Sequence, residues 1–204
     1  MYDWFMLHQR EVTWAVGAIV VVGAGFWFYN RSGSLKEERA ERAYYTAQQS
    51  VQSGNYPAAE SELSKMATRY EGTRGGIQGR LALAQILFDQ GKYQQGINEL
   101  KADKGALESK DFGSAAHMIL AAGYEQLKGY KAAADEYDAA AKAARFDQDR
   151  QRYRLYSAHA RLMAGDTAAA KRIYTELGAD SKGVVAGEAR VRLGELTPAL
   201  APKS

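Results

Sequence analysis

The chain of 204 residues contains no cysteine, only three prolines and only three histidines. Without cysteine, disulfides, zinc–thiolate sites and cysteine nucleophiles are all excluded. Because proline most often ends a helix, its scarcity leaves long stretches in which helices can form. The histidines, His8, His117 and His159, lie far apart in the sequence. A lone helical histidine is more often structural than a metal ligand, so no metal site is predicted.

The chain also lacks a block of charge of one sign. Lys and Arg number 27 and Asp and Glu 24, which gives a net charge of +3, and the two signs alternate along the chain. This pattern carries no electrostatic footprint for nucleic acid. The Gly-rich stretch at 72–79 has no Gly-Lys-Ser/Thr ending, so it is not a phosphate-binding loop. We therefore expect no catalytic residue and no cofactor, with an enzyme as the disfavoured alternative.

One long uncharged run, VTWAVGAIVVVGAGFWFY at 12–29, interrupts an otherwise mixed sequence. At about 1.5 Å per residue a helix of this length reaches across the ~30 Å hydrocarbon core of a bilayer. It predicts a single transmembrane helix with Trp14 and Trp27 near its two ends and Gly17 and Gly23 where a neighbouring helix could approach. The alternative, a cleaved secretory signal, is disfavoured because no Ala-x-Ala site follows. Residues 1–11 are predicted to lie at the membrane interface.

A fixed period dominates the remaining sequence. Four positions spaced 37 residues apart align as Gly54, Gly91, Lys128 and Gly165. Seven residues before them stand four alanines in register, at Ala47, Ala84, Ala121 and Ala158. Two residues after them stand Tyr56, Tyr93, Tyr130 and Thr167, and three further on Ala59, Gly96, Ala133 and Ala170. Such a period is typical of repeat architectures.

The pattern predicts an all-α fold, an α-solenoid of about four stacked helical hairpins. Small residues let the paired helices approach closely, and glycine at the turn ends the first helix with φ > 0. The hairpins are expected at 35–71, 75–110, 112–146 and 148–180, with a closing helix at 184–196. Residues 30–34 are predicted as a short linker, because Ser34 and Glu37 match a capping box. The repeat domain then spans 35–196 and the tail 197–204.

The motif Gly-x-aromatic-x-x-Ala, with its small residue seven positions earlier, resembles the tetratricopeptide (TPR) repeat. In that fold the first helices of the hairpins line a concave groove, and two positions flanking each register alanine tend to look into it. The partner-binding groove predicted from this resemblance contains Tyr44, Gln48, Leu81, Gln85, Phe88, Met118, Glu125, Leu155, His159 and Met163. Aromatic, Met and Gln side chains suit adaptable contact with an extended or helical protein segment, although several could instead pack between hairpins.

The whole arrangement resembles the YfgM-type family of bacterial translocon-associated proteins. The similar features are Trp4 and Phe5 before the apolar run, the aromatic residues 26–29 that end it, and the segment ERAYYTAQQSV at 41–51. The resemblance implies the bacterial inner membrane, a periplasmic repeat domain, and as partners the translocon and periplasmic chaperones. Taken alone, the basic residues after the run would place the domain in the cytoplasm.

These features predict a non-enzymatic, membrane-anchored interaction subunit that contacts the lipid bilayer and other protein subunits of a membrane complex. The alternative, with the same anchor and repeat domain, is a structural accessory subunit of another large membrane assembly, such as a respiratory, photosynthetic or outer-membrane-assembly complex. The run at 144–156, with four arginines among acids and aromatics, is either a contact patch for an acidic partner or a solvated surface. The acids favour the solvated surface.

Overall fold

The computed structural model describes residues 9–196, except for the side chains of 9–13, 15–17 and 29–30. The part of the chain so described is helical and contains no strand. Its ten helices are α2 (Gln9–Gln52), α3 (Tyr56–Arg69), α4 (Arg74–Asp89), α5 (Tyr93–Ala102), α6 (Lys104–Leu107), α7 (Gly113–Gln126), α8 (Tyr130–Ala143), α9 (Asp147–Met163), α10 (Thr167–Ala179) and α11 (Ala186–Glu195).

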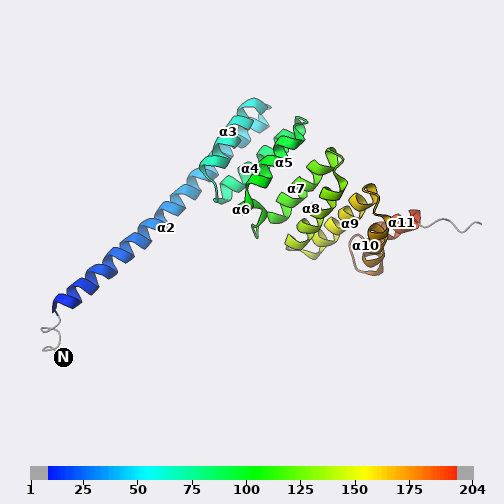
Figure 1. Ribbon diagram of the computed structural model, residues 1–204. Coiled ribbons are helices and arrows are strands. Elements are labelled where there is room, and N and C mark those ends of the chain that lie inside the picture. Colours follow the sequence, from blue (N-terminus) through cyan, green and yellow to red (C-terminus); the bar gives the residue numbers. More distant parts are fainter. Residues whose placement is uncertain (1–8, 197–204) are drawn as a thin grey trace, which may run out of the picture.

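The helices pair in chain order into four hairpins that stack along one direction, and α11 closes the row (Figure 1). The pairs are α2 with α3, α4 with α5, α7 with α8 and α9 with α10. Helices α4, α7 and α9 begin within one residue of the predicted hairpin starts, whereas α2 begins well before residue 35; the all-α solenoid is confirmed. The first half of α2 extends away from the stack, whereas its second half packs against α3 and α4 (Figure 1).

The predicted linker at 30–34 is wrong, because α2 runs through it without interruption. The two members of the expected capping box have other partners. The Ser34 hydroxyl donates to the Arg31 carbonyl at 2.9 Å, and the Glu37 carboxylate accepts from the Gly75 amide of α4 at 3.3 Å. Ala40 is fully buried against Gly75, where any Cβ would lie 2.8 Å from the Ala40 carbonyl carbon. This docking holds the helix across Gly33, and no proline stands there to break it.

The hairpins close at the predicted small residues. The four register alanines, Ala47, Ala84, Ala121 and Ala158, all have 0% exposure. Their counterparts on the second helices, Ala59, Gly96, Ala133 and Ala170, are buried as well. Small side chains on both sides let the two backbones approach, which places the larger apolar residues around the contact in continuous clusters.

All four hairpin turns share one backbone conformation. Gly54, Gly91 and Gly165 have φ of 73°, 74° and 86°, as predicted, and Lys128 takes the same left-handed conformation at φ 58°. The hydrogen bonds also match: at Lys128 its amide donates to the Glu125 carbonyl and the next amide to the Tyr124 carbonyl, both at 2.8 Å. The repeat geometry therefore imposes a conformation that lysine adopts only with strain.

Phe88 fills a space that two glycines leave between the second and third hairpins. A Cβ on Gly96 would lie 2.5 Å from the Phe88 ring, and one on Gly123 would lie 2.4 Å from it. Both distances are far below van der Waals contact. The aromatic ring is thus locked between α5 and α7, and it joins Ala84, Ile97, Leu100 and Leu120 in one core cluster.

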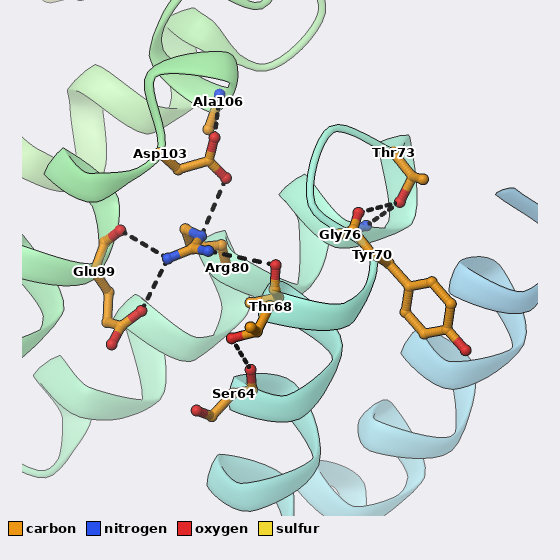
Figure 2. A network of polar contacts seen from close by, with 10 residues as sticks. Ser64, Thr68, Tyr70, Thr73, Gly76, Arg80, Glu99, Asp103 and Ala106 are labelled. Atoms are coloured by element: carbon orange, nitrogen blue, oxygen red, sulfur yellow. Dashed lines mark hydrogen bonds and ion pairs between the residues drawn. The ribbon is translucent and has the colours of Figure 1, made fainter. Parts of the chain in front are cut away.

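A buried arginine ties the first two hairpins together (Figure 2). The Arg80 guanidinium lies 3.1 Å from the Glu99 carboxylate and 3.1 Å from the Asp103 carboxylate, and it donates to the Ala67 carbonyl at 3.3 Å. Asp103 is buried and also caps α6 by accepting from the Ala106 amide at 2.9 Å. Arg80 lies on α4, so its guanidinium connects that helix to α3, to α5 and to the junction between α5 and α6.

Replacing Lys128 by glycine is expected to stabilise the protein by about 0.5–1 kcal/mol. The substitution removes roughly 1–2 kcal/mol of left-handed strain and adds roughly 0.5–1 kcal/mol of unfolded-state entropy. Urea unfolding measures the difference. The matched control is Lys65→Gly, at an exposed position inside α3, which should cost about 1 kcal/mol. A loss of stability in Lys128→Gly would contradict the assigned turn.

Gly123→Ala is expected to destabilise the protein by about 1–3 kcal/mol, because the new methyl group collides with the Phe88 ring. Combining it with Phe88→Leu should give a smaller loss than the sum of the two single variants, since the ring is then gone. Thermal unfolding of the three variants measures this coupling. Gly187→Ala, where nothing lies within 4 Å, serves as control. If the stability losses of the two single variants simply add in the double variant, the proposed contact between the Phe88 ring and Gly123 is refuted.

Candidate protein-binding face

The first helices of the four hairpins, α2, α4, α7 and α9, carry the ten residues predicted to line the groove. We call the solvent-accessible side of these helices the first-helix face. Of the ten, four are exposed: Gln48, Gln85, His159 and Met163. Four more are half-buried: Tyr44, Leu81, Met118 and Glu125. These eight remain candidates for contact with a partner.

The prediction is wrong for the other two, Phe88 and Leu155, which are 8% and 4% exposed. Phe88 is held between the glycines of neighbouring helices, as described above. Leu155 belongs to the core cluster of the last hairpin, with Ala158, Ala170 and Tyr174 among its members. Both side chains stabilise the stack and are unavailable to a partner.

Polar side chains on the first-helix face pair along the helix axis. The Gln48 amide donates to the Tyr44 hydroxyl at 2.9 Å, and the Gln85 amide donates to the Asp89 carboxylate at 3.0 Å. Both pairs join residues four apart on an exposed helix, where such contacts contribute only a few tenths of a kcal/mol. A ligand segment can therefore replace these partners at small cost.

Two exposed tyrosines extend the face beyond the predicted set. Tyr45 on α2 is 65% exposed and Tyr156 on α9 is 41% exposed, and both stand two residues before a register alanine. The Tyr156 ring packs against Tyr137 of α8 with 5.5 Å between centroids. The 37-residue period could have identified this row, because Tyr45 and Tyr156 occupy equivalent repeat positions. Exposed tyrosines are frequent anchors at protein interfaces.

Glu125 makes a contact within the third hairpin, between α7 and α8. The Tyr137 hydroxyl donates to its carboxylate at 3.1 Å. Burial raises the pKa of the Tyr137 hydroxyl well above its usual range, and the adjacent Glu125 carboxylate raises it further. Tyr137 therefore stays neutral and keeps donating throughout the physiological range. It holds Glu125 in place and supports the Tyr156 ring.

The arginines at 144–156 are neutralised by neighbouring acids. Arg145 pairs with Asp111, Arg150 with Asp147, Arg152 with Asp149 and Arg154 with Glu176. All four ion pairs lie at the surface, where each contributes little to stability. The arrangement matches the predicted solvated surface rather than a free basic patch.

The two histidines of the repeat domain lie on different helices. His117 Nδ1 is 2.7 Å from the Glu136 carboxylate, a contact that joins α7 to α8, and His159 is exposed on α9. Among the side chains that the structure describes, no group of three His, Asp or Glu is placed to hold a metal ion. His8 lies outside the described residues.

The first half of α2 presents a continuous apolar surface. From residue 18 to 28 every side chain is exposed, and the large ones, together with Trp14, range from 62% to 75% exposure. Of the residues predicted to contact the membrane or a neighbouring helix, Trp14 and Trp27 belong to this exposed set. A Cβ added at Gly23 would have no atom within 4 Å. The side-chain surroundings of Gly17 lie outside the described residues. Among the residues whose side chains the structure describes, no helix has an apolar stretch long enough to cross a membrane. The predicted span at 12–29 falls partly outside them, and residues 1–8 and 197–204 fall wholly outside.

Comparison with solved structures finds the same fold in TPR-like repeat proteins. A crystal structure of nearly identical TPR-like repeats, from a Podosopora anserina protein described as a kinesin light chain, aligns with a TM-score of 0.60 and 14% identity, covering 78% of this chain and 86% of that one. A single-substitution variant of the same protein aligns with the same score and identity, covering 78% and 85%. At this identity the likeness establishes the fold alone. A search of curated proteins found no match.

A family model described as a tetratricopeptide repeat-like domain matches residues 2–151. The match includes the apolar run, α2 and the first three hairpins. Domains of this fold are typically non-enzymatic scaffolds that bind protein partners. By this match, the chain belongs to the tetratricopeptide repeat-like domain family.

Proposed function

We propose that this protein is a membrane-anchored interaction subunit. The apolar run of α2 holds it in the bilayer, and the first-helix face binds a segment of a partner protein. The observation that carries the proposal is the continuity of α2. One helix of 44 residues, about 66 Å long, contains both the exposed apolar run and the first helix of the repeat domain.

The exposed side chains at 18–28 support the anchor. Monomeric soluble proteins rarely present so long an unbroken apolar surface to water, and such surfaces usually mark contact with a membrane or another protein. Each Val, Ile or Phe at the centre of a membrane helix contributes about −0.3 to −0.6 kcal/mol to insertion. Because the family model matches from residue 2, this segment belongs to the family pattern and is no isolated extension.

The proposed partners are other subunits of a membrane complex of the translocon and chaperone type. The resemblance to the YfgM-type family supports this class of partner, the bacterial inner membrane and a periplasmic repeat domain. The composition of the first-helix face suits the role. Its exposed Tyr, Met, Gln and His side chains are adaptable or aromatic contacts, whereas Arg150 and Arg152 of α9 are already paired with acids.

The absence of a linker defines how such an adaptor would work. Since α2 continues from the apolar run into the first hairpin, the first-helix face has a set height and direction relative to the bilayer. A flexible tether would instead let the domain search the solvent. The proposed subunit therefore binds segments presented close to the membrane surface.

Purification of the tagged full-length protein from native membranes in mild detergent, followed by quantitative mass spectrometry, tests this function. Tyr45→Glu combined with Met163→Glu should reduce the recovered partner about tenfold or more, because both side chains are exposed on the first-helix face and buried interface anchors carry most binding energy. Partners recovered at a fixed ratio from an energy-transducing or assembly complex would identify a structural accessory subunit instead.

The matched control is Tyr56→Glu combined with Val191→Glu. These residues are 46% and 62% exposed and lie on α3 and α11, away from the first helices. The control should retain the partner, and both double variants should keep the thermal unfolding midpoint of the parent. Loss of the partner in the control and retention in the first-helix variant would assign binding to another surface.

A further inference from the structure

A cavity of about 380 Å³ lies where the apolar run of α2 meets the repeat domain. Its charged lining consists of Arg31, Lys36, Arg39 and Arg69, and its apolar lining includes Phe28 and Leu35. We call it the basic pocket. It is formed between α2 and the C-terminal end of α3, so it exists only because α2 continues unbroken past residue 30.

The basic pocket has four cationic side chains and no acid in its lining. Within the described part of the chain, no carboxylate lies within ion-pair distance of Arg31, Arg39 or Arg69. The neighbouring acids have other contacts, since Glu38 pairs with Arg42 and Glu37 accepts from the Gly75 amide. Lys36 donates to a backbone carbonyl, that of Glu71, at 2.9 Å. This contrasts with 144–156, where every arginine has an acidic partner.

The residues that α2 contributes to the pocket lie on one helical face. Phe28, Ser32, Leu35 and Arg39 follow one another at spacings of three or four residues, and Arg31 and Lys36 flank that row. The row begins at the end of the apolar run, and Arg31 stands only about 3 Å of helix rise beyond residue 29. If 12–29 lies in a bilayer, the pocket opens at the depth of the lipid headgroups.

We propose that the basic pocket binds the phosphate of an anionic phospholipid headgroup, with the lipid's acyl chain alongside Phe28. Guanidinium groups bind phosphate oxygens through paired hydrogen bonds, and four uncompensated cations favour a headgroup that carries net negative charge. The apolar lining at the bilayer end of the pocket favours a lipid over free phosphate. This inference rests on the proposed membrane anchor, and it adds a binding site to it.

Native mass spectrometry of the full-length protein in neutral detergent tests the site. Phosphatidylglycerol should bind more tightly than phosphatidylcholine. Arg39→Gln combined with Arg69→Gln should weaken phosphatidylglycerol binding about tenfold or more, because each lost charge near an anionic lipid contributes roughly a fivefold factor. The matched control, Lys142→Gln with Arg172→Gln, removes two charges from α8 and α10, far from the pocket, and should bind like the parent.

Equal binding of the two lipids, or unchanged phosphatidylglycerol binding in the Arg39 and Arg69 variant, would overturn the proposal. Inorganic phosphate that binds as tightly as phosphatidylglycerol would show a phosphate site and refute the lipid assignment. Carbonate extraction of membranes distinguishes a basic pocket that does not bind lipid from a protein that is not anchored in the membrane. Release of the full-length protein into the soluble fraction would refute the anchor itself, whereas retention without headgroup preference refutes the basic pocket alone.

Discussion

The close approach of two helices at a pair of small residues, repeated every 37 positions, is the constraint on which the stack depends. Each register alanine is fully buried opposite a small residue of the second helix. This contact sets the spacing within a hairpin, and the shared left-handed turn sets where the second helix begins. Lys128 takes that conformation despite its side chain, so the packing is strong enough to impose strain on the backbone.

Stacking then determines which side chains remain available for function. Phe88 and the Arg80 network join neighbouring hairpins, one by filling a gap between glycines and the other by bridging three helices. The first-helix face keeps its exposed Tyr, Gln, Met and His side chains. The continuous α2 adds direction to this surface, since the helix that starts the stack also carries the apolar run and one wall of the basic pocket.

The repeat pattern could be predicted from sequence because spacing alone identifies the alanines and turn positions. Two features could not be predicted from sequence: the uninterrupted course of α2 and the burial of two predicted groove residues. The Ser34 and Glu37 pattern occurs both at helix starts and inside helices, and only docking of Ala40 against Gly75 decides between them. Phe88 and Leu155 occupy repeat positions that face either solvent or core. Their burial depends on neighbours in other helices, such as Gly123, which a local pattern does not reveal.

Spin-label accessibility along α2 tests the central claim, that one rigid helix joins a bilayer segment to the repeat domain. The chain has no cysteine, so single cysteines placed from 18 to 39 can each be labelled without background in protein reconstituted into lipid nanodiscs. The account predicts a continuous period of about 3.6 residues through 30–34. Oxygen collisions should dominate at 18–28, and water-soluble reagents should take over near Arg31. A lost period at 30–34, or aqueous access along the whole helix, would contradict it.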